Sequence, residues 1–165
     1  MLNRSLFIAI ALSCVTLMVQ GAQICRDDIP ATAPDSRFED NGDGTVTDLA
    51  TGLIWKQCTE GLSGRDCTTG SPSTFTWQQA LQHAADNSPW RLPNKNELAS
   101  LVERRCYRPA INTNFFPNTP WNWFWSSSTY AYSLGSAWYV DFGYGQVDDF
   151  VKFASEYVRL VREGQ

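Results

Sequence analysis

Aromatic side chains are concentrated near the C-terminus, in residues 121–130 and 137–145. Aromatics make up 13% of the chain, and each buried ring removes about 150 to 250 Å² of surface from water. The hydrophobic core must therefore be assembled around this region. Residues 123–128 and 137–142 alternate with period two, which predicts strands. Residues 143–146 predict a hairpin turn, 147–153 its return strand and 157–162 a closing strand.

Aromatic residues at strand spacing are more often buried than free to bind a ligand. We expect one or two of five rings in this region to be exposed enough to stack on a sugar. These five are Trp121, Trp123, Tyr130, Tyr132 and Tyr144.

Turn residues divide the N-terminal part of the chain. Residues 22–36 are polar and contain Pro30 and Pro34, which predicts an extended lead-in. The domain proper is predicted over 37–162. Glycine-bearing turns at 39–45 and 50–52 separate short apolar runs, so this part is predicted to form a β-meander.

The first of these turns also resembles part of a calcium-binding loop. With Gly44 as the sixth-position glycine of an EF-hand-type loop, Asp43 and Asn41 fall at the fifth and third positions. The first position is then Glu39, and the twelfth, which should supply a bidentate Glu, is Ala50. Because Asn, Asp and Gly are also the residues that a tight reversal requires, we favour a plain turn over a metal site.

The clearest helix is predicted after Thr76, which forms the Thr-x-x-Gln pattern of a capping box with Gln79. Its predicted buried face consists of Trp77, Ala80, Leu81, Ala84 and Ala85. His83, the only histidine, lies off that face. A solvated or hydrogen-bonded surface role is therefore favoured for it over catalysis or metal binding.

A second helix is predicted after Pro93. The proline holds the preceding residue in an extended conformation, and Asn94 with Glu97 supplies the cap. The buried face consists of Leu98, Leu101 and Val102.

Residues 91–108 carry five basic residues against Glu97 and Glu103, a local charge of +3. The basic residues are Arg91, Lys95, Arg104, Arg105 and Arg108. Such a patch is suited to sulfated or carboxylated ligands. Ordinary solvated charges explain it equally well, because cations are favoured near a helix C-terminus, where Arg104 and Arg105 are predicted to lie.

Residues 1–21 are typical of a secretory signal, with Arg4 near the start, an apolar run over 6–12 and a predicted cut next to Ala22. A membrane anchor is the alternative, but the uncharged stretch is near the lower limit of about 17 to 25 residues for a spanning helix. Lipid attachment at Cys14 is disfavoured, because Ala11 stands where a larger aliphatic residue is expected. We therefore expect export, with no stable membrane span after cleavage.

Cleavage would remove Arg4 and no acid, so the 13 basic residues become 12 against 17 acidic ones, a formal charge of −5. Nucleic-acid binding is disfavoured at this charge. Four cysteines would remain, an even number as expected in an oxidising compartment. Three pairings are open. We favour Cys58 with Cys67, which would close a Gly-rich excursion, and Cys25 with Cys106, which would tie the lead-in to the body.

Several motifs follow one another in a recognisable order. They are Phe-x-Asp-Asn-Gly-Asp-Gly-Thr-Val-Thr-Asp at 38–48, Thr-Gly-Leu-Ile-Trp at 51–55, Trp-Arg-Leu-Pro-Asn-Lys-Asn-Glu-Leu at 90–98, Pro-Ala-Ile-Asn at 109–112, Phe-Trp-Ser-Ser-Ser at 124–128, Ala-Trp-Tyr-Val-Asp-Phe at 137–142 and Val-Arg-Leu-Val-Arg at 158–162. The chain resembles, over about 37–162, the bacterial family typified by the C-terminal domain of the Legionella collagen-like adhesin.

The resemblance implies a C-type-lectin-like α+β fold, with two helices packed on short, twisted antiparallel strands and a distant relationship to formylglycine-generating enzymes. For the adhesin branch it also implies binding of sulfated glycosaminoglycans. The chain differs from that branch in being net acidic and in lacking a collagen-like Gly-x-y repeat. A fold by itself does not carry a function.

Our first hypothesis is an exported, non-catalytic binding or adhesion domain, secreted, periplasmic or at the surface of a bacterium, with a carbohydrate or protein partner. The candidate ligand-binding residues are Arg91, Lys95, Arg104, Arg105, Arg108, Trp123, Tyr130 and Tyr144. No cofactor is expected; calcium at Asn41 and Asp43 is the alternative.

A structural subunit of a surface appendage or envelope complex is the second hypothesis. A formylglycine-generating-type enzyme is disfavoured, because it would need a reactive cysteine pair near the end of the fold, where this chain has Leu160. Hydrolase motifs such as Gly-x-Ser-x-Gly and His-Glu-x-x-His are absent from the sequence.

Overall fold

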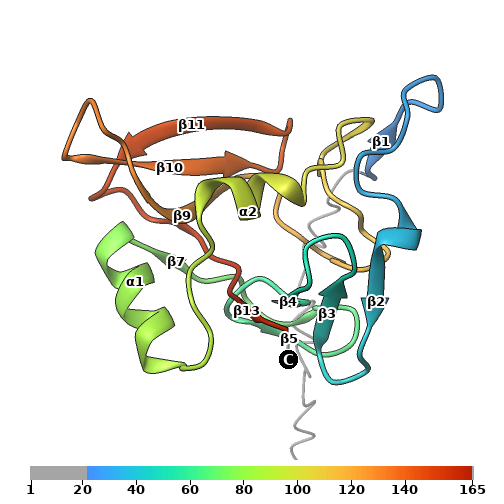
Figure 1. Ribbon diagram of the computed structural model, residues 1–165, viewed down its shortest axis with the longest axis horizontal. Coiled ribbons are helices and arrows are strands. Elements are labelled where there is room, and N and C mark those ends of the chain that lie inside the picture. Colours follow the sequence, from blue (N-terminus) through green and yellow to red (C-terminus); the bar gives the residue numbers. More distant parts are fainter. Residues whose placement is uncertain (1–21, 165) are drawn as a thin grey trace, which may run out of the picture.

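Two β-sheets share the core of the molecule, and a short helix packs between them (Figure 1). The computed structural model describes residues 22–164; the predicted signal sequence 1–21, with Cys14, lies outside them. The helical elements are η1 (Asp35–Arg37), α1 (Trp77–Asp86) and α2 (Lys95–Ser100). The strands are β1 (Ile24–Cys25), β2 (Phe38–Asp40), β3 (Thr45–Asp48), β4 (Leu53–Lys56), β5 (Leu62–Ser63), β6 (Thr69–Gly70), β7 (Thr74–Phe75), β8 (Cys106–Tyr107), β9 (Trp123–Thr129), β10 (Ser136–Asp141), β11 (Gln146–Val151), β12 (Glu156–Tyr157) and β13 (Val161–Glu163).

The larger sheet has the order β11-β10-β9-β12-β7. It is antiparallel except where β12 runs parallel to β9. The predicted hairpin is confirmed, with Val140 opposite Val147. Burial does not follow the period-two pattern along β9, since Phe124, Trp125 and Ser126 are all buried. This strand is covered on both faces.

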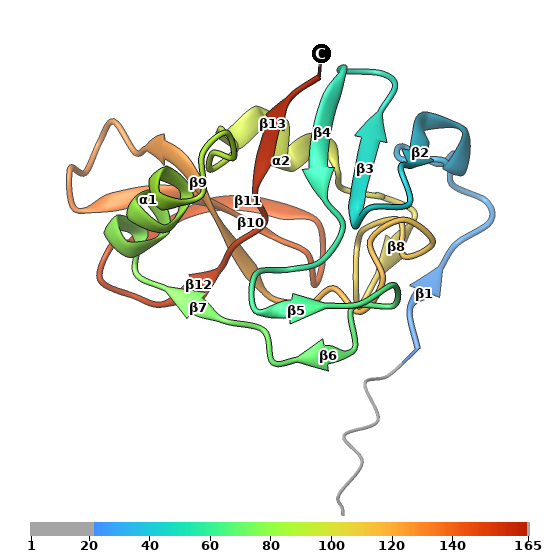
Figure 2. The ribbon, with the colours of Figure 1, turned by 90° about the horizontal axis from the view of Figure 1, so that it is seen from below.

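The smaller sheet has the order β13-β4-β3-β2, which confirms the predicted meander. The single closing strand predicted over 157–162 is wrong. The chain instead leaves the larger sheet after β12 and enters the smaller one as β13, beside β4 (Figure 2). Between them, residues 158–160 cross the interior and are fully buried, Arg159 included.

Both helices begin at the predicted caps. The Thr76 hydroxyl accepts from the backbone N–H of Gln79, and the Asn94 side chain accepts from that of Glu97, each within a reciprocal capping box. On α1, Ala80 and Ala84 are buried, but Ala85 is exposed and does not belong to the buried face as predicted.

The second helix is shorter than predicted, because it ends at Ser100. Leu98, Leu101 and Val102 are buried as expected. Arg104 and Arg105, in contrast, lie in the turn that follows, so the helix-end explanation for their charge does not apply.

The core consists of two clusters. In the first, α2 packs between the sheets through Leu98 and Leu101, against Trp55 of the smaller sheet and Phe124 of the larger one. In the second, α1 covers the larger sheet through Ala80 and Ala84, against Trp125 and Tyr139 among others. An α+β architecture results.

Two disulfides stabilise this architecture, and both join the expected partners, Cys25 with Cys106 and Cys58 with Cys67. The first fixes the lead-in, whose β1 pairs with β8. Buried Glu103 holds the lead-in further along, since its carboxylate accepts hydrogen bonds from the backbone N–H groups of Thr32 (3.1 Å) and Ala33 (2.9 Å). Among residues 22–164, no helix is long and apolar enough to cross a membrane.

A buried ion pair joins β3 to η1, the short helix that precedes β2. The Arg37 guanidinium donates two hydrogen bonds to the fully buried carboxylate of Asp48, which also accepts from the Thr51 hydroxyl at 2.8 Å. Burial by itself would raise the pKa of Asp48, but the bonds from Arg37 and Thr51 outweigh it, and the pKa lies below its ordinary value.

The pKa of Asp48 is lower in the folded than in the unfolded protein. The contribution of Asp48 to the free energy of unfolding is therefore complete above about pH 3.9, the unfolded pKa, and is lost as the pH falls through the folded pKa. We therefore expect the free energy of unfolding to fall below about pH 4. At neutral pH the free energy of unfolding of Asp48→Asn should be about 3 kcal/mol lower, because Arg37 is left without its anion. Below about pH 4 the stability of this variant should fall less than that of the natural chain. Urea unfolding at several pH values measures both. An equally steep acid loss in the variant would contradict this role for Asp48.

Candidate functional site

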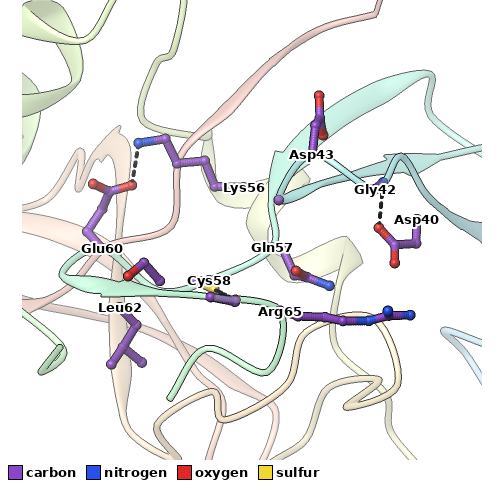
Figure 3. Close-up of a pocket in the computed structure, with 12 residues that line it drawn as sticks. Asp40, Gly42, Asp43, Lys56, Gln57, Cys58, Glu60, Leu62 and Arg65 are labelled. Carbon is purple, nitrogen blue, oxygen red and sulfur yellow. Dashed lines mark hydrogen bonds and ion pairs between the residues drawn. The ribbon is translucent and has the colours of Figure 1, made fainter. Parts of the chain in front are cut away.

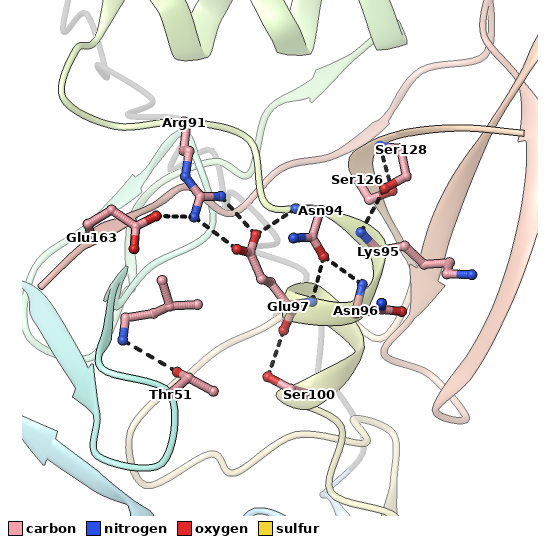
Figure 4. A network of polar contacts seen from close by, with 11 residues as sticks. Thr51, Arg91, Asn94, Lys95, Asn96, Glu97, Ser100, Ser126, Ser128 and Glu163 are labelled. Carbon is pink, nitrogen blue, oxygen red and sulfur yellow. Dashed lines mark hydrogen bonds and ion pairs between the residues drawn. The ribbon is translucent and has the colours of Figure 1, made fainter.

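The predicted basic segment does not form one continuous patch. Arg91, at its start, donates to both carboxylate oxygens of Glu97 (2.8 and 2.9 Å) and to Glu163 (2.5 Å), as Figure 4 shows. The Glu97 bonds are the main reason why the pKa of Arg91 lies above its ordinary value. Glu97 also accepts from the backbone N–H of Asn94 (2.7 Å). Arg91 therefore joins α2 to β13. Because two carboxylates pair with it, this site offers no net positive charge to a ligand.

Lys95 of α2 and Tyr130, which follows β9, both contact Trp138 of the larger sheet. The Lys95 ammonium lies 4.2 Å from the ring centre of Trp138, and Tyr130 packs edge-on against the same ring at 5.1 Å. Trp123 belongs to the packing of that sheet, since it stacks on Tyr139 at 4.6 Å and is half-buried.

Arg104 and Arg105 lie in the turn after α2. The Arg104 side chain is exposed, while its backbone N–H donates to the Thr32 hydroxyl at 2.9 Å. Arg105 is half-buried, and its Nε has no hydrogen-bond partner among residues 22–164.

Arg108 lies between two exposed aromatic rings. Its guanidinium is 5.1 Å from the ring centre of Trp121 and 5.5 Å from that of Tyr144. Nε and Nη2 both donate to the Tyr144 hydroxyl, at 3.1 and 2.7 Å. Tyr107 stacks nearly parallel to Tyr144, with 6.4 Å between the ring centres. We call Tyr107, Arg108, Trp121 and Tyr144 the arginine–aromatic platform.

Backbone contacts assemble this platform from three separate segments. The N–H of Arg108 donates to the carbonyl of Gly143 (2.9 Å), and that of Phe142 to the carbonyl of Asn122 (3.0 Å). A Cβ added at Gly143 would lie 2.8 Å from a carboxylate oxygen of Asp141 and 3.1 Å from the carbonyl oxygen of Trp121, so glycine favours the close approach of these segments. The β10–β11 turn thus brings Arg108 and Trp121 together.

The backbone conformation of Arg108 distinguishes it from the other predicted basic residues. Like Lys95, Arg104 and Arg105, and unlike Arg91, it forms no ion pair with a carboxylate within residues 22–164. Its backbone φ is +54°, in the left-handed region, which costs a non-glycine residue about 1 kcal/mol. Such conformations cluster at functional sites. The guanidinium is therefore held in place and keeps donor capacity for a ligand.

The platform continues into a shallow hollow of about 310 Å³ lined by Pro120, Trp121, Asn122 and Tyr157. Trp121 is 41% exposed and Tyr144 55%, so both rings offer surface for stacking. Three of the five rings considered for stacking are exposed rather than one or two, because Tyr132 is exposed as well.

Tyr107 and Asn122 were missing from the predicted site residues, and Trp121 was considered for stacking but was not among the candidate ligand-binding residues. The sequence signal that identifies Trp121 is its position outside the alternating strand, directly after Pro120, where no neighbouring strand covers its ring.

The two calcium candidates use their side-chain oxygens within the turn. Asp43 accepts from the backbone N–H and the hydroxyl of Thr45 (3.0 and 2.5 Å), and Asn41 accepts from the Thr47 hydroxyl (3.0 Å). These are the contacts of a tight reversal. His83 lies 2.7 Å from a carboxylate oxygen of Glu60 and stacks on Phe75, a hydrogen-bonded surface role as predicted.

Comparison with known proteins identifies the family. The search of curated proteins found no match for the chain. The sequence profile described as the Lcl C-terminal domain matches residues 44–162, which include both helices and every strand from β3 to β12. The chain therefore belongs to the Lcl C-terminal domain family.

Proposed function

We propose that this chain is an exported adhesion domain that binds an anionic glycan through the arginine–aromatic platform. The family points to a surface- or adhesin-associated domain, and together with the two disulfides to an extracellular or periplasmic location. The observation that carries the glycan proposal is the exposed guanidinium of Arg108, held between Trp121 and Tyr144 without a carboxylate partner in the described part of the chain.

The chemistry of the platform suits a sugar that carries sulfate or carboxylate groups. A guanidinium presents a planar set of donors that matches the oxygens of these anions. Nε and Nη2 of Arg108 already bond Tyr144, which leaves Nη1 and the second hydrogen of Nη2 for the ligand. The faces of Trp121 and Tyr144 supply apolar surface for the C–H face of a sugar ring. Arg104 and Arg105, four and three residues earlier, raise the local positive potential.

We further propose that the fold is lectin-like and that the chain acts without catalysis and without a cofactor. Support for a lectin-like fold comes from two short helices packed on antiparallel strands, with strands from both ends of the described chain, β2 and β13, in one sheet. The platform contains an arginine, a tryptophan and two tyrosines, which are groups suited to recognition.

Neutralising Arg108 should weaken binding of a heparin-derived tetrasaccharide by about 10- to 100-fold, because a charge-assisted contact is worth about 1.5 to 3 kcal/mol. Trp121→Ala should cost about 10-fold through lost stacking. Binding should weaken as salt is added. Isothermal titration calorimetry of Arg108→Gln and Trp121→Ala at two salt concentrations measures these effects.

Arg104→Gln is the matched control. It removes the same charge from an exposed neighbour outside the platform and should cost less than about 3-fold, through long-range attraction alone. Equal losses in Arg104→Gln and Arg108→Gln would show a diffuse electrostatic effect and would contradict a platform site.

A structural subunit is the second candidate function, favoured by one apolar tip of the molecule. Tyr132, Leu134 and Phe153 are 92%, 88% and 81% exposed. They lie on adjacent turns, since Lys152 donates through its backbone N–H to Gly135 and through Nζ to Leu134, both at 2.8 Å. Exposed apolar groups of this kind mark protein contacts. Co-purification of a defined envelope partner that is lost in Leu134→Ser with Phe153→Ser would support this candidate over glycan binding.

A further inference from the structure

A second pocket lies away from the arginine–aromatic platform and shares no residue with it. It has a volume of about 570 Å³ and lies between the β2–β3 turn and the segment after β4. Its polar lining consists of Asp40, Asp43, Lys56, Gln57, Glu60, Ser63 and Arg65, with Leu62 as the apolar side chain. A volume of this size is in the range of small-molecule sites.

Gln57 is the feature of this pocket that points to a ligand. The residue is only 5% exposed, yet its side-chain amide makes no hydrogen bond with any residue among 22–164. The protein does not cover the amide completely either, since neither its oxygen nor its nitrogen is fully buried without a partner. Burying an amide without a partner costs about 1 to 3 kcal/mol, so a buried amide that opens only into a pocket is suited to a ligand.

The backbone around Gln57 is fixed from both sides. Its N–H donates to the carbonyl of Gly44 (3.0 Å), and its carbonyl accepts from the buried guanidinium of Arg159. The Cys58–Cys67 disulfide closes the next segment of the wall. The backbone that carries the amide is therefore held in place beside the pocket, which favours preorganised recognition.

The other polar groups divide into satisfied and unsatisfied sets. Lys56 and Glu60 pair with each other at 3.0 Å, and Glu60 also contacts His83. Asp40 uses one carboxylate oxygen for the N–H of Gly42 (2.9 Å) and keeps the other. Arg65 is exposed and has no ion pair among the described residues. Figure 3 shows the ends of Asp40, Gln57 and Arg65 gathered on one side of the pocket and the Lys56–Glu60 pair on the other.

These unsatisfied groups require both donors and acceptors from a ligand. Asp40 only accepts, Arg65 only donates, and the Gln57 amide does both. The Gln57 amide and the Arg65 guanidinium are planar and present polar atoms side by side, and Asp40 adds its unused carboxylate oxygen. This set matches a pair of adjacent hydroxyl groups that both donate and accept. The lining carries three acids against two bases, so a polyanion is disfavoured here. The volume accommodates one or two hexose rings.

We propose that this pocket is a second binding site, which takes a neutral saccharide of one or two rings through Gln57, Asp40 and Arg65. It is independent of the platform, because it uses other residues and an uncharged ligand. The chain would then hold an anionic and a neutral part of a glycan, or two separate glycans, on two different surfaces.

A neutral mono- and disaccharide panel (glucose, galactose, mannose, N-acetylglucosamine, maltose and lactose) tests the proposal by nitrogen–proton correlation NMR of the oxidised domain. At millimolar concentration at least one sugar should shift the side-chain amide resonances of Gln57. Gln57→Met, which keeps the shape but not the amide, should weaken binding of that sugar at least about 10-fold. Its melting temperature should be unchanged or up to about 3 °C higher, because it removes an unsatisfied amide.

Arg108→Gln should bind the sugar as the natural chain does, so failure of this proposal and failure of the platform proposal are distinguishable. A panel in which no sugar shifts the Gln57 amide would overturn the second site. So would a sugar that binds Gln57→Met as tightly as the natural chain.

Discussion

Removal of the Cys25–Cys106 disulfide in Cys25→Ala with Cys106→Ala should lower the free energy of unfolding by about 4.5 kcal/mol. The two cysteines are 81 residues apart, and in the chain-entropy account the stabilisation grows with the length of the closed loop. This bridge is also the covalent anchor of the lead-in, where β1 pairs with β8 over only two residues.

The second disulfide provides the matched control. Cys58 and Cys67 are nine residues apart, so Cys58→Ala with Cys67→Ala should lose about 2.6 kcal/mol. Urea unfolding of the two double variants measures both losses. Equal losses, or a larger loss for the shorter loop, would contradict the account of what the long bridge does.

Replacement of Arg159 by alanine should cost about 4 kcal/mol. The side chain is fully buried, and Nη1 donates to the backbone carbonyls of Lys56 (2.8 Å) and Gln57, while Nη2 donates to the Thr119 hydroxyl (2.7 Å). Burial lowers the pKa of Arg159 to about 9, which still leaves it charged at neutral pH. Alanine would leave these acceptors without their donor and a cavity beside Phe116, whose ring centre lies 4.9 Å from the guanidinium carbon.

Arg162→Ala is the control for this variant. Arg162 lies three residues further on and is half-buried, with its guanidinium 5.3 Å from the ring centre of Trp90. Its loss should cost less than about 1 kcal/mol. Urea unfolding of the two variants compares them. If the free energies of unfolding of Arg159→Ala and Arg162→Ala differ by less than about 1 kcal/mol, the buried guanidinium contributes little to stability.

Features that depend on neighbouring residues were predicted correctly from the sequence. The capping residues Thr76 and Asn94 and the glycine turns of the meander depend on a few positions each. The disulfide partners were correct too, because a loose lead-in and a Gly-rich excursion each needed a covalent anchor.

The failed predictions concern pairing over long distances. A period-two pattern over 157–162 indicates extended structure but not which sheet takes it up, so the division into β12 and β13 was missed. The burial of Arg159 was not predicted either, because the chain crosses the interior there instead of running along one sheet. Its burial depends on carbonyls about 100 residues earlier.

The candidate site was predicted in its residue types but not in its arrangement. Arg108 and Tyr144 were among the predicted ligand-binding residues, and the structure brings them together because Arg108 bonds the backbone of Gly143. Arg91 looked equally free in the sequence, but Glu163, 72 residues later, pairs with it. Gln57 could not be identified from the sequence, because its place beside the pocket depends on contacts with distant residues such as Gly44 and Arg159.

The central claim, that an anionic glycan binds at the arginine–aromatic platform, is tested most directly by the indole N–H resonances of the seven tryptophans. Titration with a heparin-derived tetrasaccharide should shift Trp121 strongly and leave Trp55 and Trp125, which are fully buried, unmoved. The shift should disappear in Arg108→Gln. A titration that leaves Trp121 unmoved, or that shifts Trp138 beside Lys95 instead, would contradict the claim.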